Sequence, residues 1–302
     1  MTPVNPVNPV IAVTGASGAI GGRVARRLAE RGVATRLVGR TPERLPDLPG
    51  AVRAAPAAFG DATAMRDALA GAGTMLMVSA HESPDRVREH TTAVDAAVAA
   101  GVRRVVYVSF LGAAPDAAFT FARDHWHTEQ YIRGSGLAYT FLRDSLYLSG
   151  LAAMAGPDGV IRGPAGHGRV SGVAHEDIAD VATAVLLGEG GGRPGGGAHD
   201  GATYDVTGPE ALTLTEVAAE LSRVTGRTVT YVEETREEAF ASRAGYGAEE
   251  WEVTGWVSSY EAIAAGEMAA VADTVPRLTG RRAQSFAEYL DAHPRSYRHL
   301  TP

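Results

Sequence analysis

Three glycines and one arginine near the start of the sequence have the types and spacing of a dinucleotide-binding site. Gly15, Gly18 and Gly21 recur every third residue, after an apolar run and before an amphipathic segment. A strand, a glycine turn and a helix in this order let backbone N–H groups approach a pyrophosphate at the helix N-terminus. A second apolar run, residues 35–38, leads to Arg40, and a basic residue there suits the 2′-phosphate of NADP(H). The pattern predicts an NADP(H) site.

Two alternatives stand beside this interpretation. The glycine spacing departs from G-x-G-x-x-G, and glycine also occurs simply to make turns. The second strand nevertheless ends on schedule, about 20 residues after the turn, which favours cofactor binding. Arg40 could instead be a solvated surface residue, with Arg36 and Arg44 able to share either role. In a cofactor site, the turn would bind phosphate mainly through the backbone of Ser17, Gly18, Ala19 and Ile20.

The elements that would position this site alternate regularly through the first half of the chain. Strands are expected over residues 10–13, 35–38, 52–57, 74–78, 104–108 and 138–142. Helices are expected over residues 19–31, 62–70, 85–100 and 119–134. Near-continuous apolar strands, each followed by a helix, are typical of a parallel sheet covered on both faces. The predicted fold is therefore α/β, a doubly wound parallel Rossmann sheet, with its ligand outside the carboxyl ends of the strands.

The second half of the chain is less regular and predicts a smaller, mostly helical C-terminal substrate lobe. Thr213 and Glu216 have the spacing of a helix capping box, and the glycine-rich residues 188–201 predict an exposed loop. The expected organisation is a disordered lead-in at 1–9, an NADP(H)-binding Rossmann domain at 10–150 with returning segments at about 168–187 and 203–232, and the lobe at 235–302.

The composition narrows the classes of protein. The net charge is −7, from 28 basic and 35 acidic residues, which disfavours a nucleic-acid partner. Cysteine is absent, which excludes disulfides and thiolate metal sites and fits a cytoplasmic location. The sequence lacks an apolar run of about 18 residues, so no membrane segment is expected. No histidine or carboxylate grouping has convincing metal spacing, and no metal is expected.

Several longer motifs together resemble one family. The segments V-T-G-A-S-G-A-I-G-G, V-V-Y-V-S-F-L, Y-T-F-L-R and V-A-H-E-D-I-A-D-V resemble those of extended and atypical short-chain dehydrogenase/reductases. The nearest resemblance is to the NmrA-like branch, and within it to bacterial NADPH-dependent quinone oxidoreductases of type 2 and to triphenylmethane reductase. The segment D-H-W-H-T-E, residues 124–129, is the most specific part of this resemblance. It implies NADPH as cofactor.

The same resemblance puts the usual proton donor of the family in doubt. Typical members carry Tyr-x-x-x-Lys on the helix after the fifth strand, where the tyrosine is the general acid. Aligning Glu129 with the acid that often follows the lysine sets His125 at the lysine and Phe121 at the tyrosine. Phenylalanine cannot donate a proton, and Tyr107 lies inside the fifth strand. The carbonyl-reducing pair therefore looks absent.

The resemblance also implies individual site residues. Ser109 stands at the family's catalytic serine, His125 near the nicotinamide, and Tyr147 is an alternative acid; these three are the predicted catalytic residues. Ser109 could instead be a turn former, although a functional role is favoured, and Asp61 could be a helix N-cap as well as an adenine contact. The predicted cofactor contacts are Gly15, Ser17, Gly18, Ala19, Ile20, Gly21, Arg40, Asp61, Val78, Ser79, Ala80, Ser109, His125 and Arg143. The predicted acceptor pocket is formed by Phe110, Leu111, Phe121, Tyr147 and Trp256.

The function expected from these observations is NADPH-dependent hydride transfer to a quinone or a similar conjugated, electron-poor acceptor without the tyrosine–lysine pair. Hydride addition to such an acceptor gives a resonance-stabilised anion that water can protonate, so catalysis needs mainly orientation and a flat apolar pocket. Two alternatives stay open: an NADP(H)-sensing regulator without turnover, and a specialised biosynthetic ketone or enone reductase that uses another acid. The partner is a small aromatic or quinone-like molecule, and a homodimer is left open.

Overall fold

The computed structural model describes residues 10–189 and 197–301 of the chain. The described residues belong to two compact units. The first unit spans Met1–Ser109, His127–Leu142 and Ala179–Tyr204, and the second spans Phe110–Trp126, Arg143–Ile178 and Asp205–Pro302. The predicted lead-in, residues 1–9, lies outside the described residues.

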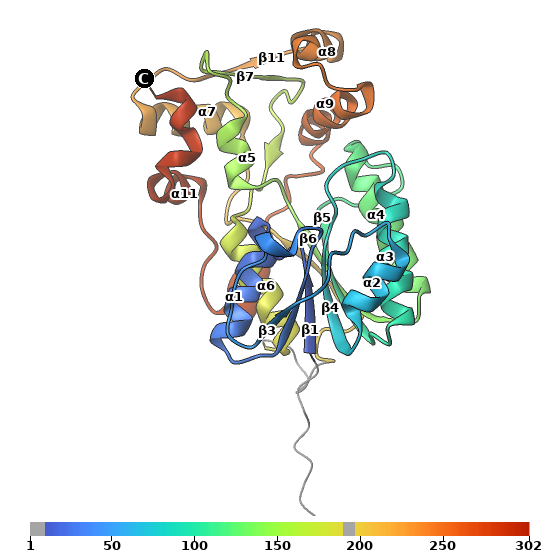
Figure 1. The fold of residues 1–302 in the computed structure, drawn as a ribbon. Helices are drawn as coiled ribbons and strands as arrows, with labels where there is room; N and C mark the ends of the chain where they lie inside the picture. Colours follow the sequence, from blue (N-terminus) through green and yellow to red (C-terminus); the bar gives the residue numbers. More distant parts are fainter. Residues whose placement is uncertain (1–9, 190–196, 302) are drawn as a thin grey trace, which may run out of the picture. The chain divides into compact units, whose positions relative to one another are not determined.

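The first unit is built on a seven-stranded sheet of order β3-β2-β1-β4-β5-β6-β9 (Figure 1). The strands pair in parallel, with Ile11 opposite Thr35 on one side and Thr74 on the other. From β1 the strands follow one another outward to β3 on one side and, from β4 onward, on the other side. This change of side next to β1 confirms the doubly wound Rossmann sheet. Its strands are β1 (Val10–Thr14), β2 (Thr35–Val38), β3 (Ala51–Arg53), β4 (Ala72–Val78), β5 (Arg104–Phe110), β6 (Ala138–Asp144) and β9 (Thr203–Val206).

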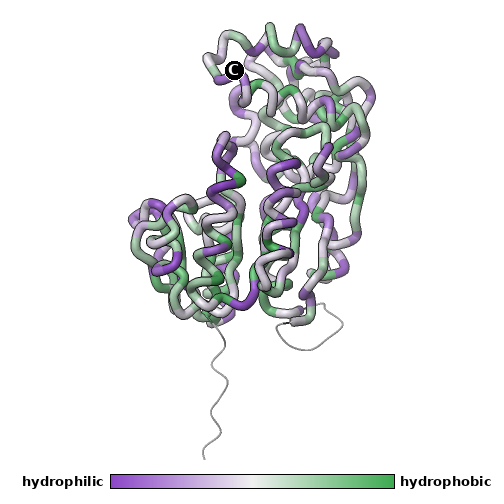
Figure 2. The backbone as a smooth tube through the Cα atoms, turned by 90° about the vertical axis from the view of Figure 1, so that its right-hand side faces the viewer, coloured by the Kyte–Doolittle hydropathy of each residue, from purple (hydrophilic) through white to green (hydrophobic). Residues whose placement is uncertain are grey.

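Helices cover both faces of this sheet. In Figure 1, α1 and α6 lie on one face and α2 and α3 on the other. Every residue of β5 is buried, because a strand with helices on both faces exposes neither set of its side chains. The helices are α1 (Ala19–Glu30), α2 (Ala62–Leu69), α3 (Arg86–Ala99), α4 (Thr120–Gly134) and α6 (His175–Leu187). Hydrophilic and hydrophobic segments alternate along these helices, as expected where one helix face is buried (Figure 2).

The second unit contains two small sheets, in which β8 (Arg169–Val170) pairs with β10 (Leu212–Thr213) and β7 (Val160–Gly163) pairs with β11 (Thr230–Glu233). The capping box predicted at Thr213 and Glu216 is confirmed at the start of α7. The helices of this unit are α5 (Leu148–Ala153), α7 (Leu214–Thr225), α8 (Arg236–Arg243), α9 (Glu250–Ala264), α10 (Thr274–Thr279) and α11 (Phe286–Ala292), with 3-10 turns at Ala244–Tyr246 and Pro294–Leu300. Residues 168–178 and 205–232 group with this unit, and the roles assigned to the predicted domains stay predictions.

The end of the third strand was predicted wrongly, because the strand stops at Arg53, not at residue 57, and the chain from residue 54 to 60 is irregular. In the glycine-rich segment expected to be an exposed loop, Gly197, Asp200 and Gly201 are exposed, whereas His199 is not, and residues 190–196 lie outside the described residues. His199 is buried and bonds the Tyr204 hydroxyl at 2.9 Å, while Asp200 accepts from Arg104 at 2.8 Å. A buried arginine needs a carboxylate partner, which the composition of a glycine-rich segment does not reveal.

Within the described ranges, no helix is long and apolar enough to cross a membrane. The same residues contain no group of three histidine, aspartate or glutamate side chains that could hold a metal ion.

Candidate cofactor and active site

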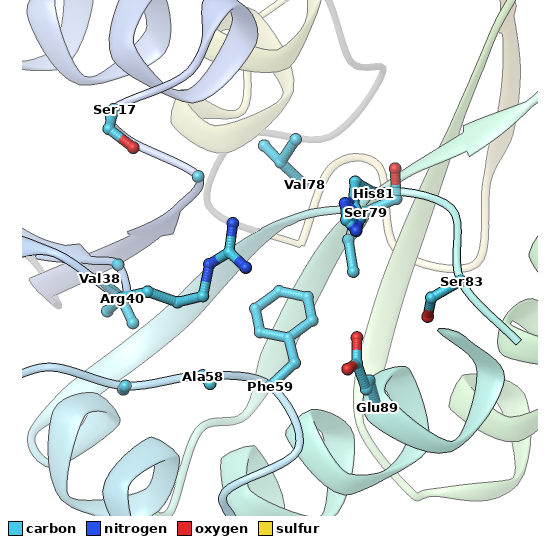
Figure 3. A pocket seen from close by; sticks show the side chains of 14 residues that line it. Ser17, Val38, Arg40, Ala58, Phe59, Val78, Ser79, His81, Ser83 and Glu89 are labelled. Atoms are coloured by element: carbon cyan, nitrogen blue, oxygen red, sulfur yellow. The ribbon is translucent and has the colours of Figure 1, made fainter. Parts of the chain in front are cut away.

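A cavity of about 270 Å³ opens in the first unit at the carboxyl ends of β1, β2 and β4 (Figure 3). This is the edge of a doubly wound sheet at which ligands bind. Fourteen residues line it: Gly15, Ser17, Val38, Gly39, Arg40, Ala57, Ala58, Phe59, Val78, Ser79, Ala80, His81, Ser83 and Glu89. Six of the predicted cofactor contacts, from three separate segments of the chain, are thus brought to one cavity: Gly15, Ser17, Arg40, Val78, Ser79 and Ala80.

The glycine turn brings the backbone close to this cavity. Gly15 has φ +60°, a left-handed conformation that a side chain would strain. At Gly21, a Cβ atom would lie 2.5 Å from the carbonyl oxygen of Gly15, so helix α1 can pack against the turn only with glycine there. Gly18 is the N-cap of α1 and supplies no side-chain cap, which leaves the helix N-terminus for an anion.

The cavity has polar groups that fit a nucleotide phosphate and ribose. Arg40 is an exposed residue, and its guanidinium extends into the cavity beside the ring of Phe59 (Figure 3). The carboxylate of Glu89 points into the same space. Among the described residues, the buried hydroxyl of Ser83 has no hydrogen-bond partner, which a polar ligand would supply. The chemistry of this donor set therefore fits NADP(H).

The remaining predicted cofactor contacts in the first unit do not line the cavity. Asp61 accepts from the backbone N–H of Ala64 at 3.0 Å and so caps α2, as the alternative interpretation expected. Ser109 is fully buried at the end of β5 and donates its hydroxyl hydrogen to Oε1 of Glu129 at 2.7 Å. Gly18, Ala19, Ile20 and Gly21 belong to the turn and the first residues of α1.

The Ser109 contact explains why a carboxylate is tolerated at position 129. Glu129 is fully buried on α4, and its second oxygen lies 3.4 Å from the Arg133 guanidinium. Arg133 in turn lies over the ring of Phe141 at 4.7 Å. A buried carboxylate with a hydroxyl donor and a cation is stable in this position. Since the Ser109 hydrogen is committed to Glu129, the serine could offer a reacting oxygen only a lone pair.

In the second unit, the N-terminal turns of α4 lie among aromatic rings. His125 is buried, with its ring centroid 6.1 Å from that of Phe110. Phe110 contacts Phe119 edge-on, and Phe119 contacts Phe121 in the same way. The chain of rings continues to Trp251 of α9, with 6.1 Å between the Phe121 and Trp251 centroids. We call Phe110, Phe119, Phe121, His125 and Trp251 the aromatic cluster.

Glycine at position 255 makes this cluster possible. A Cβ atom there would lie 2.2 Å from the ring carbon Cζ of Phe121, so only glycine lets α9 approach the ring. Phe121 and His125, which were aligned from the sequence with the family's tyrosine and lysine, occupy successive turns of α4.

The other predicted acceptor and catalytic residues lie in different surroundings. The Tyr147 hydroxyl donates to Asp144 at 3.1 Å, and its ring lies 4.3 Å from that of His175. Leu111 is buried, and its backbone N–H donates to the carbonyl of Asp144. Arg143 is half-buried near the end of β6. Trp256 contacts Tyr246 instead of the aromatic cluster and lines a second cavity of about 580 Å³.

A family model described as NAD(P)H-binding matches residues 15–189, more than half of the chain and the whole set of residues that line the first cavity. The chain belongs to this NAD(P)H-binding family.

Relatives of known activity narrow the class further. The chain is 36% identical to the (4-alkanoyl-5-oxo-2,5-dihydrofuran-3-yl)methyl phosphate reductase of Streptomyces griseus, over 92% of this chain and 95% of that protein. It is also 36% identical to the NAD(P)H azoreductase of Xenophilus azovorans, over 71% of this chain and 73% of that protein. The structure of the Escherichia coli NADPH-dependent quinone oxidoreductase in complex with NADPH is similar, with a TM-score of 0.82 and 29% identity over 93% and 99% of the two chains.

These matches confirm the resemblance to NAD(P)H-dependent reductases of the quinone oxidoreductase type. The protein is an NAD(P)H-dependent oxidoreductase. Eight residues that line the cavity were not among the predicted cofactor contacts: Val38, Gly39, Ala57, Ala58, Phe59, His81, Ser83 and Glu89. Residues 57–59 follow the third strand in the sequence, and their place after a predicted strand of a parallel sheet was the available signal.

Proposed function

We propose that this protein uses NADPH to reduce a flat, conjugated, electron-poor acceptor of the quinone class. The observation that carries the proposal is the environment of α4. Phe121 stands where the family places its proton-donating tyrosine, and it is held in a cluster of rings by Gly255. A site of this kind offers stacking surface and no strong acid, which suits an acceptor whose reduced anion is stabilised by its own conjugation.

The cofactor would be held by the first cavity. We assign the pyrophosphate to the N-terminus of α1, where the helix has no side-chain cap, and the 2′-phosphate to Arg40. When bound, the reduced nicotinamide supplies a hydride. The protein's own contribution is then to orient the reactants and to exclude water. The buried His125 would donate a ring N–H to a developing negative charge, or form a hydrogen bond with a ribose hydroxyl.

Tyr147 is the one phenol among the predicted acceptor residues, but its hydroxyl donates to Asp144. We therefore expect Tyr147→Phe to retain kcat within about fivefold, because losing one hydrogen bond of this type costs only about 1 kcal/mol. Steady-state kinetics at several pH values test this. A loss of kcat by two orders of magnitude, with KM for NADPH unchanged, would instead make Tyr147 the proton donor.

A second candidate function is the reduction of a conjugated enone in a biosynthetic step. It is favoured by the Streptomyces griseus relative, which aligns over 92% of this chain and whose name describes an acyl-substituted dihydrofuranone. Quinones and enones are both conjugated carbonyl compounds, so the aromatic cluster suits either acceptor. They differ in breadth: a quinone reductase should accept many acceptors at comparable rates, whereas a biosynthetic enzyme should prefer one by several orders of magnitude in kcat/KM.

The test is NADPH consumption by the purified protein with a panel of benzoquinones, naphthoquinones, azo dyes, triphenylmethane dyes and butenolide enones, with NADH in parallel. Saturable turnover of several quinones with preference for NADPH is the expected result. Turnover confined to an enone would favour the second candidate. Tight NADPH binding without any turnover would reject both and leave the sensing regulator.

A further inference from the structure

The backbone of Ala80, in the wall of the first cavity, is held at both of its polar groups by side chains of α3. The Ala80 N–H donates to Nε2 of His90 at 2.9 Å. The Ala80 carbonyl accepts from Nε of Arg86 at 3.0 Å. Both side chains are buried, with exposed fractions of 0% for His90 and 3% for Arg86. Ala80, the second residue after the end of β4, is thus fixed from two directions.

The contacts of His90 determine its tautomer. Because Nε2 accepts the Ala80 N–H, this nitrogen carries no hydrogen, and in the neutral ring the hydrogen is on Nδ1. Nδ1 then donates to the hydroxyl oxygen of Thr128 at 2.9 Å, and the Tyr107 hydroxyl lies 3.5 Å away. Burial, together with the nearby Arg86 cation, lowers the pKa of His90 to about 3. The ring is therefore neutral throughout the physiological range, and the acceptor on Nε2 is permanent.

Thr128 and its neighbour Glu129 on α4 reach the ends of two adjacent strands. Thr128 holds His90, which holds the segment after β4, and Glu129 accepts directly from Ser109 near the end of β5. The strands β4 and β5 are neighbours in the sheet. Two consecutive residues of the segment that resembles the quinone reductases thereby fix the carboxyl ends at which a ligand of such a sheet lies.

We propose that His90 is a positioning residue of the cofactor site: a buried neutral imidazole that, supported by Thr128, sets the place of Ala80 and so the shape of the cavity wall. Because the Ala80 N–H is engaged by His90, backbone N–H donors to the cofactor at this wall come from its neighbours Ser79 and His81. The inference rests on the proposed placement of NADPH in the first cavity. It assigns to this part of α3 a binding role, beyond that of core packing.

The test compares His90→Leu, which keeps an apolar filler, with His90→Gln, whose Oε1 can replace Nε2 as the acceptor of the Ala80 N–H. The control is Val94→Ala, a fully buried position on the same helix that packs in the core of the sheet. Two readouts are used: the NADPH dissociation constant, and hydrogen exchange of the backbone peptide covering residues 78–84 in the cofactor-free protein.

We expect His90→Leu to weaken NADPH binding about tenfold and to speed exchange at residues 79–81, because a buried N–H loses its acceptor. His90→Gln should restore affinity to within about threefold of the original. Val94→Ala should lower the melting temperature without changing the dissociation constant. In the original protein, ¹⁵N NMR of the His90 ring should give an unprotonated Nε2 and a protonated Nδ1, and Thr128→Val should perturb that Nδ1 signal.

Two results would overturn the inference. The first is unchanged exchange and unchanged NADPH affinity in His90→Leu. The second is an equal loss of affinity in His90→Leu, His90→Gln and Val94→Ala, which would make the effect one of general destabilisation. If the original protein does not bind NADPH at all, the proposed function fails, while the exchange measurement still decides whether His90 positions Ala80.

Discussion

Replacing Arg40 with alanine is expected to weaken NADPH binding about 10- to 150-fold, since charge-assisted hydrogen bonds to a phosphate contribute about 1.5–3 kcal/mol. Binding of NADH should change by less than about threefold, because NADH has no 2′-phosphate to lose. Arg40 extends into the first cavity from the segment after β2, where the adenosine end of a dinucleotide binds in this fold. The ratio of the two dissociation constants is the quantity to measure.

Arg44 offers a matched control for this experiment. It lies four residues further along the chain, is exposed, and does not line the cavity. Arg44→Ala removes the same charge from the same region, so it reports the general electrostatic effect on an anionic ligand. Equal weakening of NADPH and NADH by Arg40→Ala, or equal effects of the two substitutions on NADPH, would contradict the assignment of the 2′-phosphate to Arg40.

The second large effect is expected at the glycine turn. In Gly21→Ala, the new Cβ would lie 2.5 Å from the Gly15 carbonyl oxygen and 2.6 Å from that of Thr14, and both are backbone atoms that a rotamer change cannot move. Helix α1 must therefore shift away from the turn. We expect the free energy of unfolding to fall by about 2–3 kcal/mol, as for other overpacked sites. NADPH binding should weaken at least about 100-fold, because the N–H groups of the helix N-terminus no longer face the ligand.

Gly32→Ala separates these two consequences. Gly32 follows α1, has φ +69°, and a Cβ atom there meets nothing within 4 Å. The substitution strains the backbone and should cost about 1 kcal/mol of stability without touching the turn. Denaturant unfolding and NADPH titration of both variants give the comparison. If Gly21→Ala binds NADPH as well as Gly32→Ala does, the glycine turn does not hold the cofactor.

The sheet and the glycine turn could be predicted because each depends on local sequence. The apolar runs at β1, β2, β4, β5 and β6 and the helices between them are visible in residue type alone, and even the Thr213–Glu216 cap was readable. The position of Arg40 was predictable because the residues that follow the second strand of this fold lie at the carboxyl edge of the sheet, where the ligand binds. Arg40 lines the first cavity, and its contact with a cofactor stays a prediction.

What could not be predicted depends on partners far away in the sequence. The burial of Ser109 against Glu129, 20 residues later, turns an apparent catalytic hydroxyl into a committed donor. Trp251 and Trp256 lie on one helix but, five residues apart, on different sides of it, so Trp251 contacts Phe121 while Trp256 contacts Tyr246. His90 carried no motif at all, and its importance comes from contacts with three separate segments, at Ala80, Tyr107 and Thr128.

The neutral imidazole under the cavity wall also makes the folded protein sensitive to acid. In the unfolded chain a histidine has a pKa of about 6.5 and takes up a proton as the pH falls. In the folded protein the pKa of His90 is about 3, so the native state does not take up that proton. Between about pH 6.5 and pH 3 the unfolded chain therefore binds more protons, and by linkage this group lowers the free energy of unfolding progressively as the solution is acidified. The neutral His90 ring that fixes Ala80 at neutral pH therefore lowers the stability of the folded protein in acidic surroundings.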